Sequence, residues 1–441
     1  MLPHSASARY GLLGLPLAFV AMPLYVVLPQ HHAQAYGLPL AALGAVLLFT
    51  RLADAFVDPW LGRWADHWLS RPSRALFAAS VAAATLALGF VLLFNPPVRQ
   101  TVPLLAWCAF TLILTFLAYS LTSVLHLAWG TRLGGDVQQR SRLVAWREGF
   151  GLLGVLLANV LATQAGMGWT SVALSVGLCA GVWALSAGPR PTPTPGQSAS
   201  PSTIPPSTAM HASPLVSAAH APAGNSGGWH ALAQPWRGAG FRRLMALFLV
   251  NGVASAIPAT LVLFFIQDRL RDMAGAPIYL GLYFLMAALG VPAWVRLIGR
   301  IGPMRAWALG MLLSVLSFVG VLGLGEGDRA GYLAICLAGG LALGADLTAP
   351  GTLLTGVVQR AGHTAQAEGA YAGWWQWATK LNLALAAGLA LPALQALGYT
   401  PGAQEPGALQ ALSWVYGGLP CVFKLLALLA CWHWRRHPAL A

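Results

Sequence analysis

Long runs of apolar residues recur along the whole chain, separated by short polar or basic turns. Each run is long enough for a helix that crosses a hydrocarbon core of about 30 Å. The pattern predicts twelve spans, at residues 10–29, 38–61, 75–94, 103–129, 143–164, 169–187, 244–266, 277–298, 304–324, 331–356, 369–391 and 412–433. We therefore expect an all-α polytopic membrane protein that contacts membrane lipid.

The composition supports a membrane protein and argues against a nucleic-acid partner. Of 441 residues, 57% are hydrophobic and only 8% are charged, whereas a soluble domain carries roughly 25% charged residues. The formal charge of +13 does not indicate nucleic-acid binding, because the arginines lie between apolar runs rather than in a basic stripe with aromatic residues. The five cysteines are scattered in apolar segments, so we expect neither a disulfide framework nor a metal site.

The stretch between Pro191 and Gly228 is rich in proline, serine and threonine and has no charged residue. Such a segment cannot bury enough apolar surface to fold, which predicts a disordered linker. It divides the spans six and six, giving an N-terminal six-helix bundle over 1–188, a cytoplasmic linker over 189–240 and a C-terminal six-helix bundle over 241–441. Similar basic turns follow the second and eighth spans, as parallel repeats of a transporter would have.

The arginines fix the expected orientation. Placing the N-terminus inside leaves few of them in the outer loops, where only Arg99, Arg269, Arg271 and Arg329 remain. Cytoplasmic loops carry the excess of basic residues. The asymmetry predicts an inner-membrane protein with both termini in the cytoplasm.

Two carboxylates lie inside the second span. Asp54 and Asp58 are four residues apart, so they share one face of a helix, and Arg51 precedes Asp54 by three. Two nearby carboxylates repel each other, and a proton, a bound cation or Arg51 would relieve that repulsion. Oxygen ligands suit Na⁺ or a proton rather than a soft metal. The alternative is a structural Arg51–Asp54 pair, with Asp58 near water at the helix end.

Other charges lie in or near predicted spans. Lys380 lies well inside the eleventh span, where it can snorkel only a short way, so we expect it to face a cavity. Lys424 in the twelfth span is equally consistent with packing inside the bundle, and Asp346 and Glu368 are possible counter-charges. Arg147 opens the fifth span and could instead face the cytoplasm. The tryptophans at 374, 375 and 377 could stack on a sugar or anchor the helix at the interface.

Three segments resemble the glycoside–pentoside–hexuronide:cation symporter family of the major facilitator superfamily. RLADAFVDPWLGRWAD resembles the family pattern R-x-x-D-A-x-x-D-P-x-x-G-x-x-x-D. AWGTRLGGDVQQRSRLVAWREG resembles its stretch between spans four and five, and AEGAYAGWWQWATKL resembles its stretch into span eleven. The resemblance implies the major facilitator fold, two six-helix bundles, and no cofactor beyond a coupling ion.

Matched position by position, the resemblance implies three sets of site residues. The cation site would be Asp54, Asp58 and Ser120. The solute site would include Arg147 and Lys380, with Ser123 and His126 near the family's sugar-binding aspartate, and the cytoplasmic gating turn would include Gly62 and Asp66. From the residues themselves we add Trp375 to the solute site and Arg71 to the gating turn. Val57 stands where the family has an asparagine, which removes a Na⁺ ligand and favours protons, so H⁺ and Na⁺ both remain candidates.

These features together predict a non-enzymatic, monomeric, cation-coupled transporter of a small solute, expected to be a sugar or glycoside, that works by alternating access. A second hypothesis is an exporter or carrier of amphipathic, lipid-like solutes, which the apolar first span would suit. A membrane-embedded enzyme is the third, but the sequence has no HExxH or GxSxG motif, and His31 and His32 point apart on a helix.

Overall fold

The structure is a computed structural model that describes residues 3–68, 71–133, 137–190, 228–362 and 368–434. Within these ranges every regular element is a helix, as the sequence predicted. At some helical positions, residues 58–60 and 62–67 among them, only the backbone is described.

The chain divides into two compact units. The first consists of Met1–Leu24 and Phe56–Ser217, and the second of Tyr25–Ala55 and Ala218–Ala441. One boundary lies within the π-helical segment η1 (Pro23–Val27) and another within helix α4 (Leu40–Trp68). Tyr25–Ala55 groups with the second unit rather than with the other residues of the first six predicted spans, and the division into two six-helix bundles stays a prediction.

The first unit is built around α2 (Gly14–Met22). Its other helices are α1 (His4–Gly11), the C-terminal part of α4, α5 (Pro72–Phe94), α6 (Thr101–Arg132), α7 (Val137–Val160) and α8 (Gly166–Ser186). Helix α2 packs against α7 and α8, and α5 packs against α6 and α8. A Cβ atom at Gly154 in α7 would overlap the Leu15 carbonyl group. Small residues at such interfaces let membrane helices approach closely.

Eleven helical runs in the described part of the chain are long and apolar enough to span a membrane. One of them, Arg142–Ser186, has 45 residues and contains most of α7, the π-helical segment η2 (Leu161–Ala165) and α8. At about 1.5 Å per residue, a straight helix of that length is far too long for one crossing.

This long run reverses direction at Gly166, where φ is +82°. Helix α7 runs parallel to the first span, because Trp146 lies beside Gly11 and the later residue Gly154 lies beside the later residue Leu15. On α8 the order is reversed, with Gly177 beside Pro16 and Gly181 beside Leu13. The two helices are therefore antiparallel, and the run supplies the fifth and sixth of the predicted spans.

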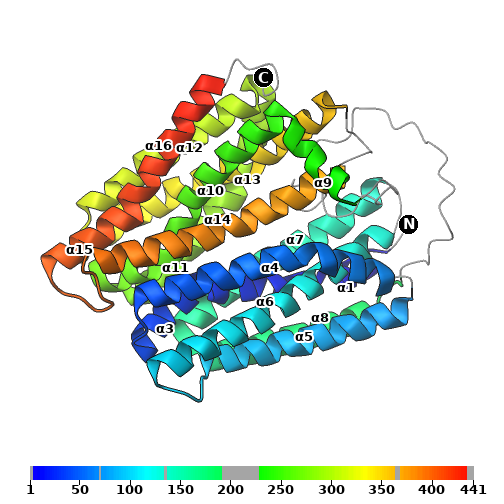
Figure 1. The fold of residues 1–441 in the computed structure, drawn as a ribbon, viewed down its shortest axis with the longest axis horizontal. Coiled ribbons are helices and arrows are strands. Elements are labelled where there is room, and N and C mark those ends of the chain that lie inside the picture. The colour runs from blue at the N-terminus through cyan, green and yellow to red at the C-terminus, as the bar shows by residue number, and fades with distance from the viewer. Residues whose placement is uncertain (1–2, 69–70, 134–136, 191–227, 363–367, 435–441) are drawn as a thin grey trace. The chain divides into compact units, whose positions relative to one another are not determined.

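The second unit contains the remaining helices. They are α3 (Leu28–Tyr36), the N-terminal part of α4, α9 (Gly228–Arg237), α10 (Ala239–Phe264), α11 (Ala276–Ile301), α12 (Pro303–Val319), α13 (Arg329–Arg360), α14 (Glu368–Ala396), α15 (Pro406–Ser413) and α16 (Leu419–Trp434). Short segments join them: η3 (Phe265–Arg269), η4 (Met273–Gly275), η5 (Gly320–Gly323) and η6 (Trp414–Gly418). Helix α13 packs against α11 and α12, and α10 packs against α14 and α16, as Figure 1 shows.

A hydrophobic cluster fills one part of the second unit. Its members include Phe241, Trp307, Tyr371 and Trp375, all nearly inaccessible to solvent. They come from α10, α12 and α14, so burial of these large rings stabilises the packing of those helices.

The end of the predicted linker is helical. Helix α9 occupies Gly228–Arg237, and α10 begins at Ala239. Trp236 packs edge-on against Phe241 and Trp374, which explains why these last residues are ordered. Residues 191–227 lie outside the described part of the chain, so the disordered linker remains a prediction there.

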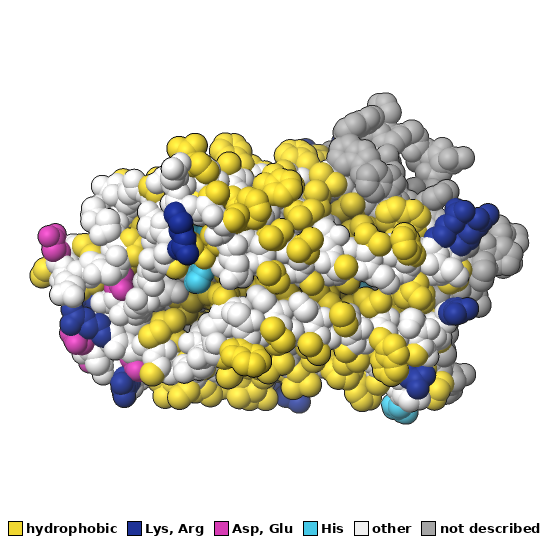
Figure 2. Space-filling model, turned by 90° about the horizontal axis from the view of Figure 1, so that it is seen from below, with side chains coloured by type: hydrophobic (Ala, Val, Ile, Leu, Met, Phe, Trp, Pro, Cys, Tyr) yellow, Lys and Arg dark blue, Asp and Glu magenta, His cyan; other side chains and the backbone are white. Residues whose placement is uncertain are grey.

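The outer surface carries large apolar side chains. Phe77, Trp183 and Leu429, for example, are more than 60% exposed. Figure 2 shows hydrophobic side chains across the middle of the visible face, with most charged side chains towards its two ends. A surface of this kind suits contact with lipid rather than water.

Candidate functional site

Asp54 and Lys380 form a buried ion pair within the second unit. Asp54 lies in α4 and Lys380 in α14, and the distance between Oδ2 and Nζ is 2.7 Å. The side chain of Asp54 is 6% exposed and that of Lys380 is 19% exposed. The sequence assigned Asp54 to the cation site and Lys380 to the solute site, and the structure brings the two side chains into direct contact.

Arg51 makes a second connection between the same two helices. Its Nη1 atom donates a hydrogen bond of 2.6 Å to the backbone carbonyl of Leu383. Its guanidinium also lies over the ring of Tyr25, 4.7 Å from the centroid, close enough for a cation–π interaction. Arg51 and Asp54 share one face of α4, and their partners lie three residues apart on α14. Two charged side chains therefore hold α4 against α14.

The close packing of α4 on α14 explains why these side chains meet. A Cβ atom at Gly44 would lie 3.0 Å from the Ala387 carbonyl oxygen, and one at Gly388 would lie 2.9 Å from Leu48. Because both glycines lack side chains, the helix backbones come close together, and the charged groups one or two turns away can reach across.

Asp58 follows Asp54 by one turn of α4, but the side chains of Asp58 and Asp66 and the surroundings of Gly62 lie outside what the structure describes. Their assignments to the cation site and the gating turn therefore remain predictions. Arg71 is exposed and precedes the first residue of α5.

The predicted solute residues of α6 lie in the first unit. His126 is buried, and its Nε2 atom lies 2.8 Å from the Tyr10 carbonyl oxygen. Because a carbonyl oxygen only accepts, Nε2 carries the hydrogen, and the His126 ring also lies against the Tyr10 ring, with the centroids 4.5 Å apart. Ser120 is buried and Ser123 is partly exposed.

Arg147 also lies in the first unit, near the same part of the chain. Its Nη2 atom lies 2.6 Å from Oε1 of Glu148, and the Arg147 side chain is 12% exposed. The backbone of α7 at Arg147 contacts Gly11 and Gly14. His126 and Arg147 therefore both lie beside residues 10–14, although they belong to different helices.

Trp375 lies inside the hydrophobic cluster. It is 4% exposed, and its ring stacks on Phe248 with a centroid distance of 3.8 Å. Contact between Trp375 and a solute would require this stack to open, so its assignment to the solute site stays a prediction.

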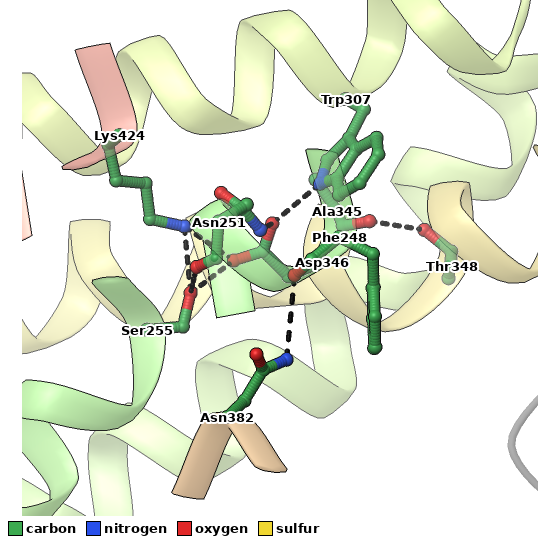
Figure 3. A network of polar contacts seen from close by, with 9 residues as sticks. All are labelled: Phe248, Asn251, Ser255, Trp307, Ala345, Asp346, Thr348, Asn382 and Lys424. Atoms are coloured by element: carbon green, nitrogen blue, oxygen red, sulfur yellow. Dashed lines mark hydrogen bonds and ion pairs between the residues drawn. The ribbon is translucent and has the colours of Figure 1, made fainter. Parts of the chain in front are cut away.

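A second buried ion pair was not assigned to any site from the sequence. Asp346 in α13 lies 2.6 Å from Nζ of Lys424 in α16. Asn251 and Ser255 from α10 and Trp307 from α12 also donate hydrogen bonds to the Asp346 carboxylate, as Figure 3 shows. The charge of Asp346 and Lys424 drew attention to them in the sequence, but the three neutral donors gave no such signal.

Asp268, at the end of the span Ala239–Arg269, anchors the loop after α14, which lies outside the spans. Its Oδ2 atom accepts hydrogen bonds from the Tyr399 hydroxyl, at 2.5 Å, and from the Gly402 amide, at 2.8 Å. Burial and the adjacent Asp268 carboxylate raise the pKa of Tyr399 above its usual value. Tyr399 therefore stays protonated and keeps donating to Asp268.

Comparison with known proteins identifies transporters as relatives. The inner membrane symporter YicJ of Escherichia coli is 29% identical over 132 residues, which are 30% of this chain and 28% of YicJ. The isoprimeverose transporter of Lactiplantibacillus pentosus is 27% identical over 198 residues, which are 41% of this chain and 40% of the transporter. The matched stretch is less than half the length of each relative.

Comparison with solved structures shows the fold. The nucleoside transporter NupG has 15% sequence identity and a TM-score of 0.67, and the match covers 97% of this chain and 99% of that one. The family described as MFS/sugar transport protein matches residues 9–187 and 222–435. These two ranges make up most of the sequence and leave out much of the predicted linker, and the chain therefore belongs to the MFS/sugar transport protein family.

Proposed function

We propose that this chain is a secondary transporter that couples the movement of a small solute, a sugar or glycoside, to a cation by alternating access. Membership of a sugar-transport family supports the solute class. Similarity to a symporter and to an isoprimeverose transporter supports both coupling and solute. None of these relatives gives support to a membrane-embedded enzyme.

The ion pair between Asp54 and Lys380 is the observation that carries this proposal. A charge at the bilayer centre costs at least about 2.5–3.5 kcal/mol, so a buried carboxylate needs a positive partner in every state of the cycle. Lys380 is that partner here. When α4 and α14 separate, a cation bound at Asp54 takes the place of the lysine. Cation binding and the Asp54–Lys380 contact are then mutually exclusive, which links the ion to a helix movement.

The position of Asp54 along α4 supports this coupling. The boundary between the two units follows Ala55, one residue after Asp54. Helix α4 therefore continues from the second unit into the first just beyond Asp54. By the family resemblance, Asp58 and Ser120 complete the cation site, and the ion is H⁺ or Na⁺.

The solute site of this proposal combines side chains that donate hydrogen bonds to hydroxyl groups. By the family resemblance they include Arg147, Ser123 and His126, and Lys380 and Trp375 are the further candidates. Arg presents a planar set of donors that matches paired hydroxyls. Once the cation releases Lys380 from Asp54, the lysine is available to the solute, so ion and solute would bind in an ordered way.

The test is uptake into proteoliposomes that contain the purified protein. A panel of radiolabelled glycosides and pentosides is offered under an inward proton gradient, an inward Na⁺ gradient, or neither. We expect one gradient to drive accumulation of at least one sugar. Lys380→Ala should abolish accumulation, whereas Arg296→Ala, which removes an exposed arginine near the end of α11, serves as the control and should transport normally.

Each outcome of this assay decides between functions. Accumulation with neither gradient would exclude cation coupling. Failure of every sugar, together with movement of a fluorescent phospholipid between leaflets, would favour the carrier of amphipathic solutes.

The proposed orientation places both termini, and residues 191–227 between the units, in the cytoplasm of a monomer in the inner membrane. A reporter that is active only in the cytoplasm, fused within residues 191–227, should be active. Activity of a periplasmic reporter at the same position would contradict the orientation.

A further inference from the structure

The carboxylate of Asp346 is saturated with hydrogen-bond donors. Oδ1 accepts from Nδ2 of Asn251 at 2.9 Å and from Nε1 of Trp307 at 2.8 Å. Oδ2 accepts from Oγ of Ser255 at 2.9 Å and from Nζ of Lys424 at 2.6 Å. A carboxylate has about four lone-pair sites, and all of them are used. Three of the four donors are neutral groups, which hold the carboxylate in place independently of the lysine.

The Lys424 ammonium group occupies a site with the features of a cation site. Nζ lies 2.6 Å from a carboxylate oxygen and 2.9 Å from the Ser255 hydroxyl oxygen. The Lys424 side chain is 5% exposed. Close by, the Oδ1 atom of Asn251 is buried and has no hydrogen-bond partner. Figure 3 shows Lys424, Ser255 and Asp346 pointing toward one another.

A small cavity lies beside this group. Asp346, Lys424 and Ser255 line it together with Tyr283 and Ser314, and its volume is about 10 Å³. That is the space which about one water molecule requires. An ion at the position of Nζ could therefore have oxygen ligands from the protein and one from water, without any change in the surrounding helices.

The choice of lysine at this position is informative. Only two lysines occur in the whole sequence, Lys380 and Lys424, and all other permanently basic side chains are arginines. Both lysines form ion pairs with buried aspartates. An ammonium group is a compact point charge, whereas a guanidinium is a planar fork. The compact group resembles a monovalent metal ion in size and charge.

We propose that Asp346, Ser255 and the adjoining cavity form a monovalent-cation site that Lys424 occupies as a built-in cation. The site suits a singly charged ion because it holds a single carboxylate. The distances of 2.6 and 2.9 Å are also too long for Mg²⁺, which binds oxygen at about 2.0–2.1 Å. The second unit thereby carries its own counter-charge and takes up no ion here from either side of the membrane.

This pair differs from the pair of the proposed coupling site. Lys380 is 19% exposed and its partner Asp54 lies one residue before a boundary between the units. Lys424 is 5% exposed, and all its partners belong to the second unit. Three neutral donors from α10 and α12 hold Asp346 in place, so the pair with Lys424 has no reason to open during transport. The inference does not depend on the proposed transport activity.

Truncation of the lysine should expose the cation site. The full-length Lys424→Ala variant is purified in detergent, and its melting temperature is measured in KCl, NaCl and choline chloride at equal ionic strength. A ligand that binds only the folded protein stabilises it. We expect KCl or NaCl to raise the melting temperature of Lys424→Ala by about 3 °C or more relative to choline chloride, beyond any rise in the wild type.

Two further variants make the result specific. In Lys424→Ala combined with Asp346→Asn, the carboxylate is absent, so the additional cation response should disappear. In Lys424→Arg the positive charge remains, so no additional response should appear. A Lys424→Ala protein that can be purified only in KCl or NaCl would also support the proposal.

The proposal is wrong if Lys424→Ala responds to K⁺ and Na⁺ no more than the wild type does. It is equally wrong if the response persists after Asp346→Asn. If Lys424→Ala cannot be purified in any of the three salts but the double variant can, then no cation replaces the lysine, and the proposal fails.

Discussion

A double-mutant cycle on Asp54 and Lys380 tests the contact on which the proposed coupling rests. The four proteins are the wild type, Asp54→Asn, Lys380→Ala and the double variant. At an Oδ2–Nζ distance of 2.7 Å and an effective dielectric constant of about 20, the Coulomb attraction is about 6 kcal/mol. Desolvation of the two charges offsets part of it.

Removal of one partner should cost about 3 kcal/mol, at the lower end of the range for buried pairs, because Lys380 is partly exposed. The double variant removes both charges of the Asp54–Lys380 pair, so it should cost about as much as either single variant. The expected interaction free energy is therefore about 2–3 kcal/mol. The free energy of unfolding is measured for each purified protein in mixed micelles with increasing denaturing detergent.

Asp54→Asn combined with Lys424→Ala is the matched control, because Lys424 lies in the same unit but pairs with Asp346. The costs of these two substitutions should add to within about 0.5 kcal/mol. If the costs of Asp54→Asn and Lys380→Ala also add within that margin, the two side chains do not interact, and the proposed exchange between lysine and cation loses its basis.

Three further predictions test other parts of the molecule. Asp58→Asn mimics a protonated carboxyl group, so solute exchange across the membrane should continue while gradient-driven accumulation stops; continued accumulation would place the coupling site elsewhere. Gly154→Ala should destabilise the protein by about 1–3 kcal/mol, because the added methyl group overlaps the Leu15 carbonyl. Gly149→Ala in the same helix has open space around it and should leave the stability unchanged. Equal melting temperatures of the two variants would contradict the close packing at Gly154. Tyr399→Phe removes one of the two hydrogen bonds to Asp268 and should cost about 1.5–3 kcal/mol. Because the pKa of Tyr399 is raised in the folded protein, the wild type should lose stability above about pH 10, where the tyrosine of the unfolded chain ionises first. This loss of stability should be smaller in Tyr399→Phe. If both proteins lose the same stability at alkaline pH, Tyr399 does not cause the loss.

The sequence predicted the spans well because each depends on local hydrophobicity. Even the hairpin of α7 and α8, which forms one uninterrupted helical run, was separated correctly, since the polar and glycine-rich residues near Gly166 mark the reversal. The free-energy cost of a charge in the membrane also pointed to Asp54 and Lys380. Local reasoning of this kind identifies which residues matter, but it does not identify their partners.

The partners depend on packing between helices far apart in the sequence. The sequence offered Arg51, three residues away, as one possible partner of Asp54, but it could not show that the lysine from α14 also reaches the carboxylate across a close helix contact. Asn251, Ser255 and Trp307 are neutral and common in membrane helices, so only the geometry shows that they converge on Asp346. The tryptophan at 375 suggested a sugar platform, and its stack on Phe248 could not be inferred from composition.

The membership of Tyr25–Ala55 in the second unit has a consequence for biosynthesis. The partners of this segment are made much later: the Ala41 amide bonds to Gln395, which is 354 residues away, and Arg51 to Leu383, which is 332 residues away. When α3 and the N-terminal part of α4 enter the bilayer, α14 has not yet left the ribosome. The polar groups of Arg51 and Asp54 must meanwhile be accommodated by lipid headgroups, water or the insertion machinery. The second unit can be completed only near the end of translation, so slow synthesis of the last spans should expose the first ones to quality-control proteases.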